Sequence, residues 1–350
     1  MIRRYVFGSP IETDAVLCKP EAAVWQEGRL LLRDNVFCCG LKEDEIVYGL
    51  GQNVRGINKR GWIYESNCTD DPQHTECKTS LYGAHNFLIL DGEKKCGIFV
   101  DTPAKVTFDI GYTDYEQMRI APATPDFEFY LIEEESLDGV VSTFRKLIGR
   151  SFIPPLWGFG YGQSRWGYDS AEGVRQVAAG YRDNHIPIDS IYLDIDYMER
   201  YKDFTINEDT FPDFDRLIGQ MKEQGIHLVP IIDGGVKKED GYDVYEEGTA
   251  EGYFCKDADG EDFVIGVWPG KSCLPDMLNE EAGSWFAHKY KILLDKGIDG
   301  FWNDMNEPAI FYSEKGLREV FEKIDEYRTQ NLDVDTFFAF QNMVADISSS

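Results

Sequence analysis

Gly300-Phe301-Trp302-Asn303-Asp304-Met305-Asn306-Glu307-Pro308 is the most informative stretch of this chain. The apolar run 298–302 has the length and composition of a short buried strand. Two carboxylates follow it, Asp304 and Glu307, and burying a carboxylate is costly unless it is hydrogen-bonded or used in chemistry. The alternative is a helix N-terminus, because Asp is a common N-cap and a Glu three residues later completes a capping box. The spacing alone does not separate catalysis from capping.

The second part of the chain, from about residue 155, alternates apolar strand patterns with amphipathic helix patterns. Strands alternating with helices predict a parallel sheet, because each crossover between parallel strands needs a helix. Asp169 and Glu172 form a capping box for the first of these helices. Before the run that ends at Asp304, strands are expected at 157–162, 191–193 and 228–232.

Three successive strands end in aspartate: Asp194, Asp233 and Asp304. In a TIM-type (β/α)8 barrel all strand C-termini open on one face, where the active site is built. A doubly wound sheet usually carries a glycine-rich phosphate loop that opens a helix, and the glycines of 158–162 lie in an aromatic run instead. The pattern therefore predicts the first four strands of a barrel over residues 151–350, with an insertion at about 235–278.

The first part, residues 1–150, shows alternation of period two. The runs 87–90 and 96–100 flank an Asp-Gly turn signal, and further alternating runs lie at 106–110 and 127–131. Many short strands separated by turns predict a β-sandwich. Apolar residues of 140–148 share one helical face, and Gly149 is a suitable stop.

Composition narrows the function classes. The net charge is −28, which argues against a nucleic-acid partner. The sequence contains no run of about 18 apolar residues, so it predicts no membrane-spanning helix. Residues 1–10 lack the apolar stretch of a signal peptide. Eight scattered cysteines and five histidines fit neither a metal site nor a disulfide framework, so we expect no metal or cofactor and a cytoplasmic location with free thiols.

Two tryptophans lie in predicted loops where the wall of a pocket is expected. Trp166 lies just beyond the first strand, and Trp268 precedes Pro269 within the insertion. A flat aromatic face suits the apolar face of a sugar ring, whereas the alternative for each is ordinary core packing, since large aromatics are mostly buried. Their position beside Gly and Pro favours the wall of a pocket.

These motifs together resemble glycoside hydrolase family 31, the retaining α-glucosidases. Residues 302–307 are similar to the family's nucleophile signature, and Leu193-Asp194-Ile195-Asp196-Tyr197-Met198 with Lys202-Asp203-Phe204-Thr205 is similar to its second-strand motif. Tyr48-Gly49-Leu50-Gly51 resembles its Gly-x-Gly motif, with Gln52 where Glu is usual. The motifs span residues 45–310, and their order and spacing make the resemblance specific.

The resemblance implies Asp304 as the catalytic nucleophile, with Glu307 beside it in the signature. It implies Asp194 as a ligand of sugar hydroxyls and Asp70 as a residue that reaches the pocket from an N-terminal loop. Ile195 stands where family xylosidases often carry Cys, which favours glucose. With Asp233, Trp166 and Trp268 these residues form the predicted substrate site for an oligosaccharide or α-glucoside.

A retaining glycosidase also needs a protonated carboxyl about 5–5.5 Å from its nucleophile. Glu307 suits that role by spacing, but in the family the acid/base is an aspartate on a later strand, and the tail 337–350 shows no further strand that ends in Asp. We therefore expect the N-terminal part of a longer enzyme, inactive by itself. The alternatives are an α-xylosidase, an α-galactosidase or another α-glycosidase of the same fold, and a non-catalytic carbohydrate-binding remnant. The sequence leaves the oligomeric state open, a homo-oligomer included.

Overall fold

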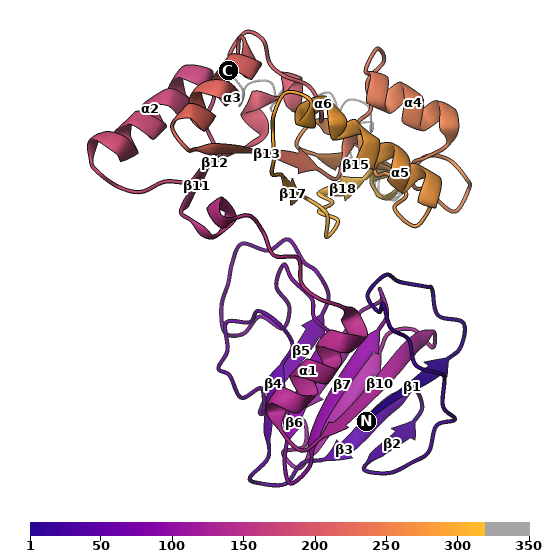
Figure 1. Cartoon of the computed structure of the whole chain (residues 1–350). Coiled ribbons are helices and arrows are strands. Elements are labelled where there is room, and N and C mark those ends of the chain that lie inside the picture. The colour runs from indigo at the N-terminus through magenta and orange to yellow at the C-terminus, as the bar shows by residue number, and fades with distance from the viewer. Residues whose placement is uncertain (319–350) are drawn as a thin grey trace. The chain divides into compact units, whose positions relative to one another are not determined.

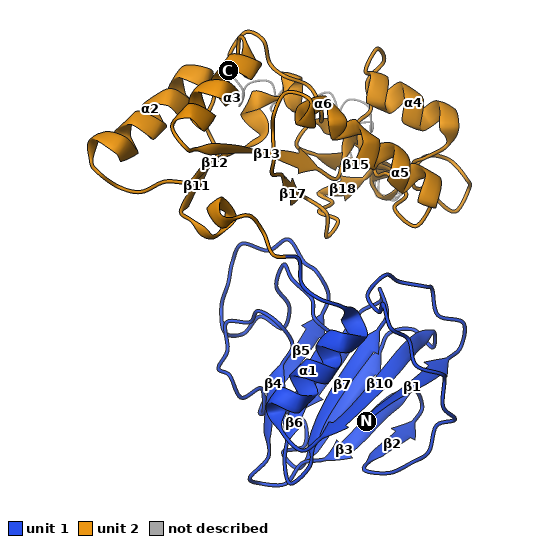
Figure 2. Cartoon of the chain, in the orientation of Figure 1, with its two compact units in different colours: residues 1–152 blue, residues 153–350 orange. Residues whose placement is uncertain are grey.

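A computed structural model describes residues 1–318 of the chain. The chain divides into two compact units, the first comprising Met1–Phe152 and the second beginning at Ile153 (Figures 1 and 2). Unit 1 holds the predicted β-sandwich, and unit 2 holds the predicted alternation of strands and helices.

Unit 1 consists of two five-stranded sheets whose neighbouring strands are all antiparallel. One sheet has the order β1-β10-β7-β6-β4 and the other β2-β3-β9-β8-β5. The bounds in the first sheet are β1 Ile2–Phe7, β10 Phe127–Glu134, β7 Lys95–Asp101, β6 Phe87–Asp91 and β4 Ile46–Gly49. In the second they are β2 Leu30–Arg33, β3 Val36–Gly40, β9 Gln117–Pro122, β8 Val106–Ile110 and β5 Trp62–Ser66.

The core of unit 1 is a cluster of aromatic rings from both sheets. Phe37 of β3 is fully buried and stacks on Phe129 of β10, with ring centroids 4.2 Å apart. Trp25 meets Phe37 edge-on at 5.2 Å, in the geometry that aromatic pairs prefer. Period-two alternation places these rings on inward faces. The β-sandwich is therefore confirmed, and its interior is what holds the two sheets together.

A single helix, α1 (Leu137–Ile148), covers the outer face of the first sheet, as Figure 1 shows. It begins at Ser136, whose side chain accepts a hydrogen bond from Gly139 N, and ends at Gly149 with a φ of 90°. Phe144 of this helix stacks on Phe87 of β6 with ring centroids 3.7 Å apart. The predicted helix and its glycine stop are therefore confirmed, and α1 covers the outer face of this sheet over β6, β7 and β10.

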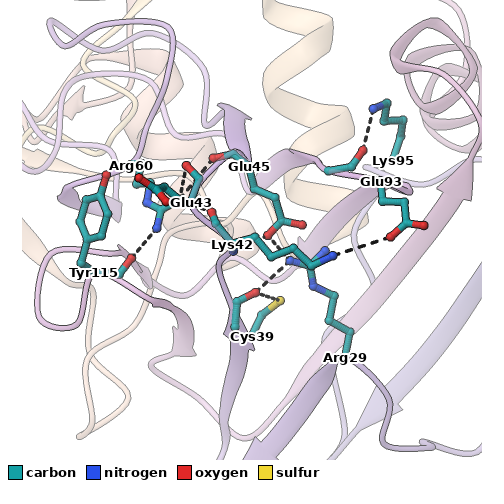
Figure 3. A network of polar contacts seen from close by, with 11 residues as sticks. Arg29, Cys39, Lys42, Glu43, Glu45, Arg60, Glu93, Lys95 and Tyr115 are labelled. Atoms are coloured by element: carbon teal, nitrogen blue, oxygen red, sulfur yellow. Dashed lines mark hydrogen bonds and ion pairs between the residues drawn. The ribbon is translucent and has the colours of Figure 1, made fainter.

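A polar network holds the turn between β3 and β4 (Figure 3). The buried Glu45 carboxylate accepts hydrogen bonds from the Arg29 guanidinium and, at 2.8 Å, from Lys42 N. Arg60 donates to Lys42 O and, at 2.8 Å, to Tyr115 O. Burial by itself would raise the pKa of Glu45, but the Arg29 and Lys42 contacts lower it overall. The charge of Glu45 is thus stabilised by Arg29, which precedes β2, and by the backbone of Lys42 within the turn.

Unit 2 is built on a four-stranded parallel sheet of order β11-β12-β13-β17. Helices follow the strands along the chain, and the buried faces of α2 and α3 contribute Val174, Leu217 and Met221 to one core with the sheet. This is the predicted partial TIM-type barrel. The bounds are β11 Gly162–Arg165, α2 Ala171–Asp183, β12 Ser190–Leu193, α3 Phe214–Glu223, β13 His227–Asp233, α5 Glu280–Lys289, α6 Lys291–Leu294 and β17 Trp302–Asp304.

Three local predictions in unit 2 were wrong. The first strand is Gly162–Arg165 rather than 157–162, because a 3-10 turn, η1 (Leu156–Phe159), follows the two prolines and stacks Trp157 on His227. The N-cap of helix α2 is Ser170, whose side chain accepts a hydrogen bond from Gly173 N, so Asp169 and Glu172 do not form the capping box of this helix. The last strand is confined to 302–304 and is only partly buried, and Ile298 is a buried residue of the irregular segment that precedes this strand.

The insertion contributes three strands and one helix, and its strands form a small antiparallel sheet with β18, which follows β17 in the chain; the strand order is β14-β16-β15-β18. The elements of this region are β14 Val236–Lys237, α4 Asp243–Glu251, β15 Val264–Val267, β16 Gly270–Cys273 and β18 Tyr312–Ser313.

Two 3-10 turns, η2 (Ile195–Tyr197) and η3 (Glu199–Tyr201), follow β12. The tail segment 337–350, where no further strand was expected, lies outside the described residues.

Candidate functional site

The predicted aspartates lie at the carboxyl ends of neighbouring parallel strands. Asp233 is the register partner of Asp304 between β13 and β17, and Asp194 directly follows β12, which pairs with the other side of β13. After Asp304 the backbone turns at Met305, with a φ of 59°, and residues 306–308 form a turn rather than a helix. The capping interpretation of Asp304 and Glu307 is therefore excluded.

The electrostatics show that these carboxylates share one environment. Asp233 is 3% exposed, and burial, followed by the charges of Asp304 and Asp194, raises its pKa to about 7. Burial also raises the pKa of Asp194, assisted by the charge of Asp304 and opposed by a 2.8 Å hydrogen bond from Ile195 N. Like charges this close destabilise each other's ionised forms. Such a cluster at strand ends is typical of a catalytic site.

A fourth carboxyl, Asp203, belongs to the same cluster although the sequence analysis did not select it. Its side chain is buried, and Oδ1 accepts a hydrogen bond from Asp233 N at 2.9 Å. Burial, then the charge of Asp233, raises the pKa of Asp203 well above its usual value. The available signal was its place in the second-strand motif, since no periodicity indicates that this residue folds back onto β13.

Glu307 is half-buried, and its Oε2 is buried without a hydrogen-bond partner among the described residues. Neighbouring Met305 and Ala309 pack with Ile265 and Val267 of the insertion sheet. The turn that carries Glu307 is thus anchored by apolar contacts, while one oxygen of its carboxylate stays unpaired.

The two tryptophans do not pack in the core. Trp166 is 59% exposed in the turn after β11, and Trp268 is 48% exposed between β15 and β16. Trp268 meets Phe311 edge-on at 5.0 Å. Their exposure excludes ordinary core packing and leaves their faces open to a ligand.

Ile195 lies in the hydrophobic core of unit 2 at 4% exposed. Asp70 lies exposed on the loop between β5 and β6 of unit 1. Sugar contacts by Ile195, Asp70 and Asp233 stay predictions.

Within residues 1–318 no group of three or more His, Cys, Asp or Glu side chains is arranged to hold a metal ion. In the same range, no helix combines the length and the apolar character needed to cross a membrane. All eight cysteines have free thiols.

Two family models match the chain. Residues 151–346 match the glycosyl hydrolases family 31 TIM-barrel domain, and residues 34–109 match the glycosyl hydrolase 31 N-terminal galactose mutarotase-like domain. The first match covers more than half of the chain and includes the ends of β12, β13 and β17.

Curated relatives and solved structures agree with these models. Alpha-glucosidase 2 of Bacillus thermoamyloliquefaciens is 36% identical over 80% of this chain, and an alpha-glucosidase of Saccharolobus solfataricus is 30% identical over 84%. The chain spans only 36% and 42% of their respective lengths. A family 31 dextranase of Flavobacterium johnsoniae, solved with glucose, superposes with a TM-score of 0.74 at 25% identity over 81% of this chain and 35% of its own. The chain belongs to glycoside hydrolase family 31.

Proposed function

We propose that this chain supplies the nucleophile's half of the active site of a retaining, exo-acting α-glucosidase that releases terminal α-linked glucose from oligosaccharides. Asp304 is the nucleophile, Asp194 binds sugar hydroxyls, and Trp166 and Trp268 line the pocket. The observation that carries this proposal is the placement of Asp304 beside Asp233 and Asp194 at the ends of adjacent strands.

The environment supports this division of roles. A retaining glycosidase needs one ionised carboxylate to attack the anomeric carbon and one protonated carboxyl to assist the leaving oxygen. Asp233 retains a proton more readily than an ordinary aspartate, but at 3% exposed it is too enclosed to reach a glycosidic oxygen. We therefore assign the acid/base to a carboxyl outside the four strands of the parallel sheet.

The substrate and the location are part of the same proposal. The α-glucosidases named among the relatives support glucose over xylose or galactose. The free thiols support a reducing cytosol.

Selective sugar binding tests the proposal. Saturation-transfer NMR on the chain should give a signal with glucose and isomaltose that exceeds the signal with xylose or galactose. Asp194→Asn should weaken it, because the amide replaces an acceptor oxygen with a donor, whereas Glu208→Gln on an exposed loop serves as the matched control. Preference for xylose or galactose would contradict the glucosidase assignment.

A further inference from the structure

The segment between β12 and α3 is held in an unfavourable backbone conformation. Arg200, Tyr201 and Phe204 have φ values of 50°, 59° and 62°, in the left-handed region that non-glycine residues rarely adopt. Such conformations persist only where the surrounding structure fixes them, and they cluster at functional sites. Here Tyr242 donates to Asp203 O at 2.8 Å, and Thr205 Oγ1 accepts from Glu199 N at 3.0 Å.

This fixed segment places the Asp203 carboxyl against the end of β13. Asp203 is 1% exposed, and its Oδ1 accepts from Asp233 N. The other oxygen, Asp203 Oδ2, is buried and has no hydrogen-bond partner within residues 1–318, and the same holds for Asp233 Oδ1. Ionised carboxylates only accept hydrogen bonds, so two ionised groups leave both atoms unsatisfied, whereas a protonated carboxyl gains a donor that it can direct to the other carboxylate.

Among the ion pairs of the described residues, none joins this pair of carboxyls to a cationic side chain, so their negative charge is left for a proton to neutralise. Asp304 on β17 and Asp194 after β12 add negative charge near Asp233. The Tyr197 hydroxyl donates its hydrogen bond to Ile231 O at 2.8 Å. The neighbouring Lys202 directs Nζ to Glu199 at 3.2 Å and to Glu239 at 3.4 Å. The Tyr242 hydroxyl donates to the backbone oxygen of Asp203, whereas the Asp203 carboxyl accepts from the backbone of Asp233.

We propose that Asp203 is a positioning residue that holds Asp233 in a carboxylic acid–carboxylate pair with one shared proton, which fixes the end of β13 and limits the negative charge beside Asp304. The raised pKa values of both groups agree with a proton that persists near neutral pH. The shared proton follows from the contacts of this chain, while its consequence for Asp304 rests on the proposed function. The opposing account is an ionised Asp203 that acts only as a backbone acceptor.

Infrared difference spectroscopy on the full chain at pH 7 tests the pair without sugar or turnover. The wild type should show the carbonyl stretch of one protonated carboxylic acid, and Asp203→Asn and Asp233→Asn should each shift its frequency or remove it, because the proton loses its second carboxylate. Glu208→Gln should leave it unchanged. Either variant suffices if the other fails to fold, and a band that is unchanged in the folded variants, or is absent from the wild type, would overturn the proposal.

A second readout separates positioning from simple structural support. An activated fluoroglucoside should label Asp304 of the wild type covalently. Asp203→Ala should slow that labelling at least tenfold and shift its pH profile. Asp203→Asn should label at a rate within about threefold of the wild type. An unshifted pH profile in Asp203→Ala would overturn the positioning role. If the wild type shows the infrared band but no labelling, the proposed function fails and the proton-sharing pair stands.

Discussion

Replacing Asp304 by Asn should stabilise unit 2, because the site holds like charges together. Asp304 and Asp233 are register partners on adjacent strands, and strands lie about 4.8 Å apart. Two unit charges about 5 Å apart at an effective dielectric constant of about 20 repel each other by about 3 kcal/mol. Asp233, with a pKa of about 7, is mostly ionised at pH 8, but Asp304 is half-exposed and solvent screens the repulsion, so we expect a gain of about 1–2 kcal/mol at that pH.

The gain should depend on pH with a definite sign. The folded-state pKa of Asp233 is raised, so the neutral form of this group stabilises the fold at low pH, and that contribution is lost as pH rises through about 7. At pH 5 Asp233 is protonated and no longer repels Asp304. The stabilisation by Asp304→Asn should therefore shrink to below about 1 kcal/mol at pH 5.

Urea unfolding followed by tryptophan fluorescence measures this effect. With a slope of about 2 kcal/mol per molar urea, the midpoint at pH 8 should rise by about 0.5–1 M. Glu208→Gln, which also removes one negative charge, is the control and should shift the midpoint little at either pH. A lower midpoint for Asp304→Asn at pH 8, or an equal gain at both pH values, would refute the clustered charges. The signal reports mainly on unit 2, which contains Trp157, Trp166, Trp268, Trp285 and Trp302.

Three further predictions concern the sandwich core, its polar turn and catalysis. Phe37→Ala should destabilise unit 1 by about 3–5 kcal/mol in calorimetry, because a fully buried ring is deleted from a stacked cluster; a loss under 1 kcal/mol would contradict that packing. Glu45→Gln should cost about 1–3 kcal/mol at pH 7 in urea unfolding. That loss should diminish below about pH 4, because a lowered folded-state pKa makes the charge of Glu45 stabilising only above that range, and a pH-independent loss would disagree. The proposed function assigns the general acid, worth about 10²–10⁴-fold, to a carboxyl outside the four parallel strands, so we expect the chain by itself to hydrolyse p-nitrophenyl α-glucoside no faster than buffer. Rapid turnover by a monodisperse preparation would place the acid within these 350 residues, with Glu307 examined first.

Periodicity predicted the architecture where one face of an element is buried. The strands of 87–101 and the helix ending at Gly149 follow directly from alternation, a turn signal and a glycine stop. The strand end at Asp233 was predicted equally well, because His227–Asp233 is an almost continuous buried run.

Local backbone structure and the role of single side chains were harder to predict where they depend on contacts with residues distant in sequence. Trp157 joins a 3-10 turn because its ring stacks on His227, a residue 70 positions away, which no window around 157–162 contains. Asp203 escaped selection because its role depends on a backbone amide of the next strand. The convergence of Asp194, Asp233 and Asp304 was predictable, since parallel strands place their carboxyl ends on one edge.

The most direct test of the catalytic assignment is the site of covalent capture. A mechanism-based fluoroglucoside with a fluoride leaving group needs little help from an acid, so it reports on the nucleophile itself. After incubation with the folded chain, peptide mass spectrometry should find the glycosyl adduct on Asp304 and none in Asp304→Asn, which keeps the shape of the side chain but cannot form the ester. An adduct on Glu307 or on another carboxylate would contradict the assignment of Asp304 as the nucleophile.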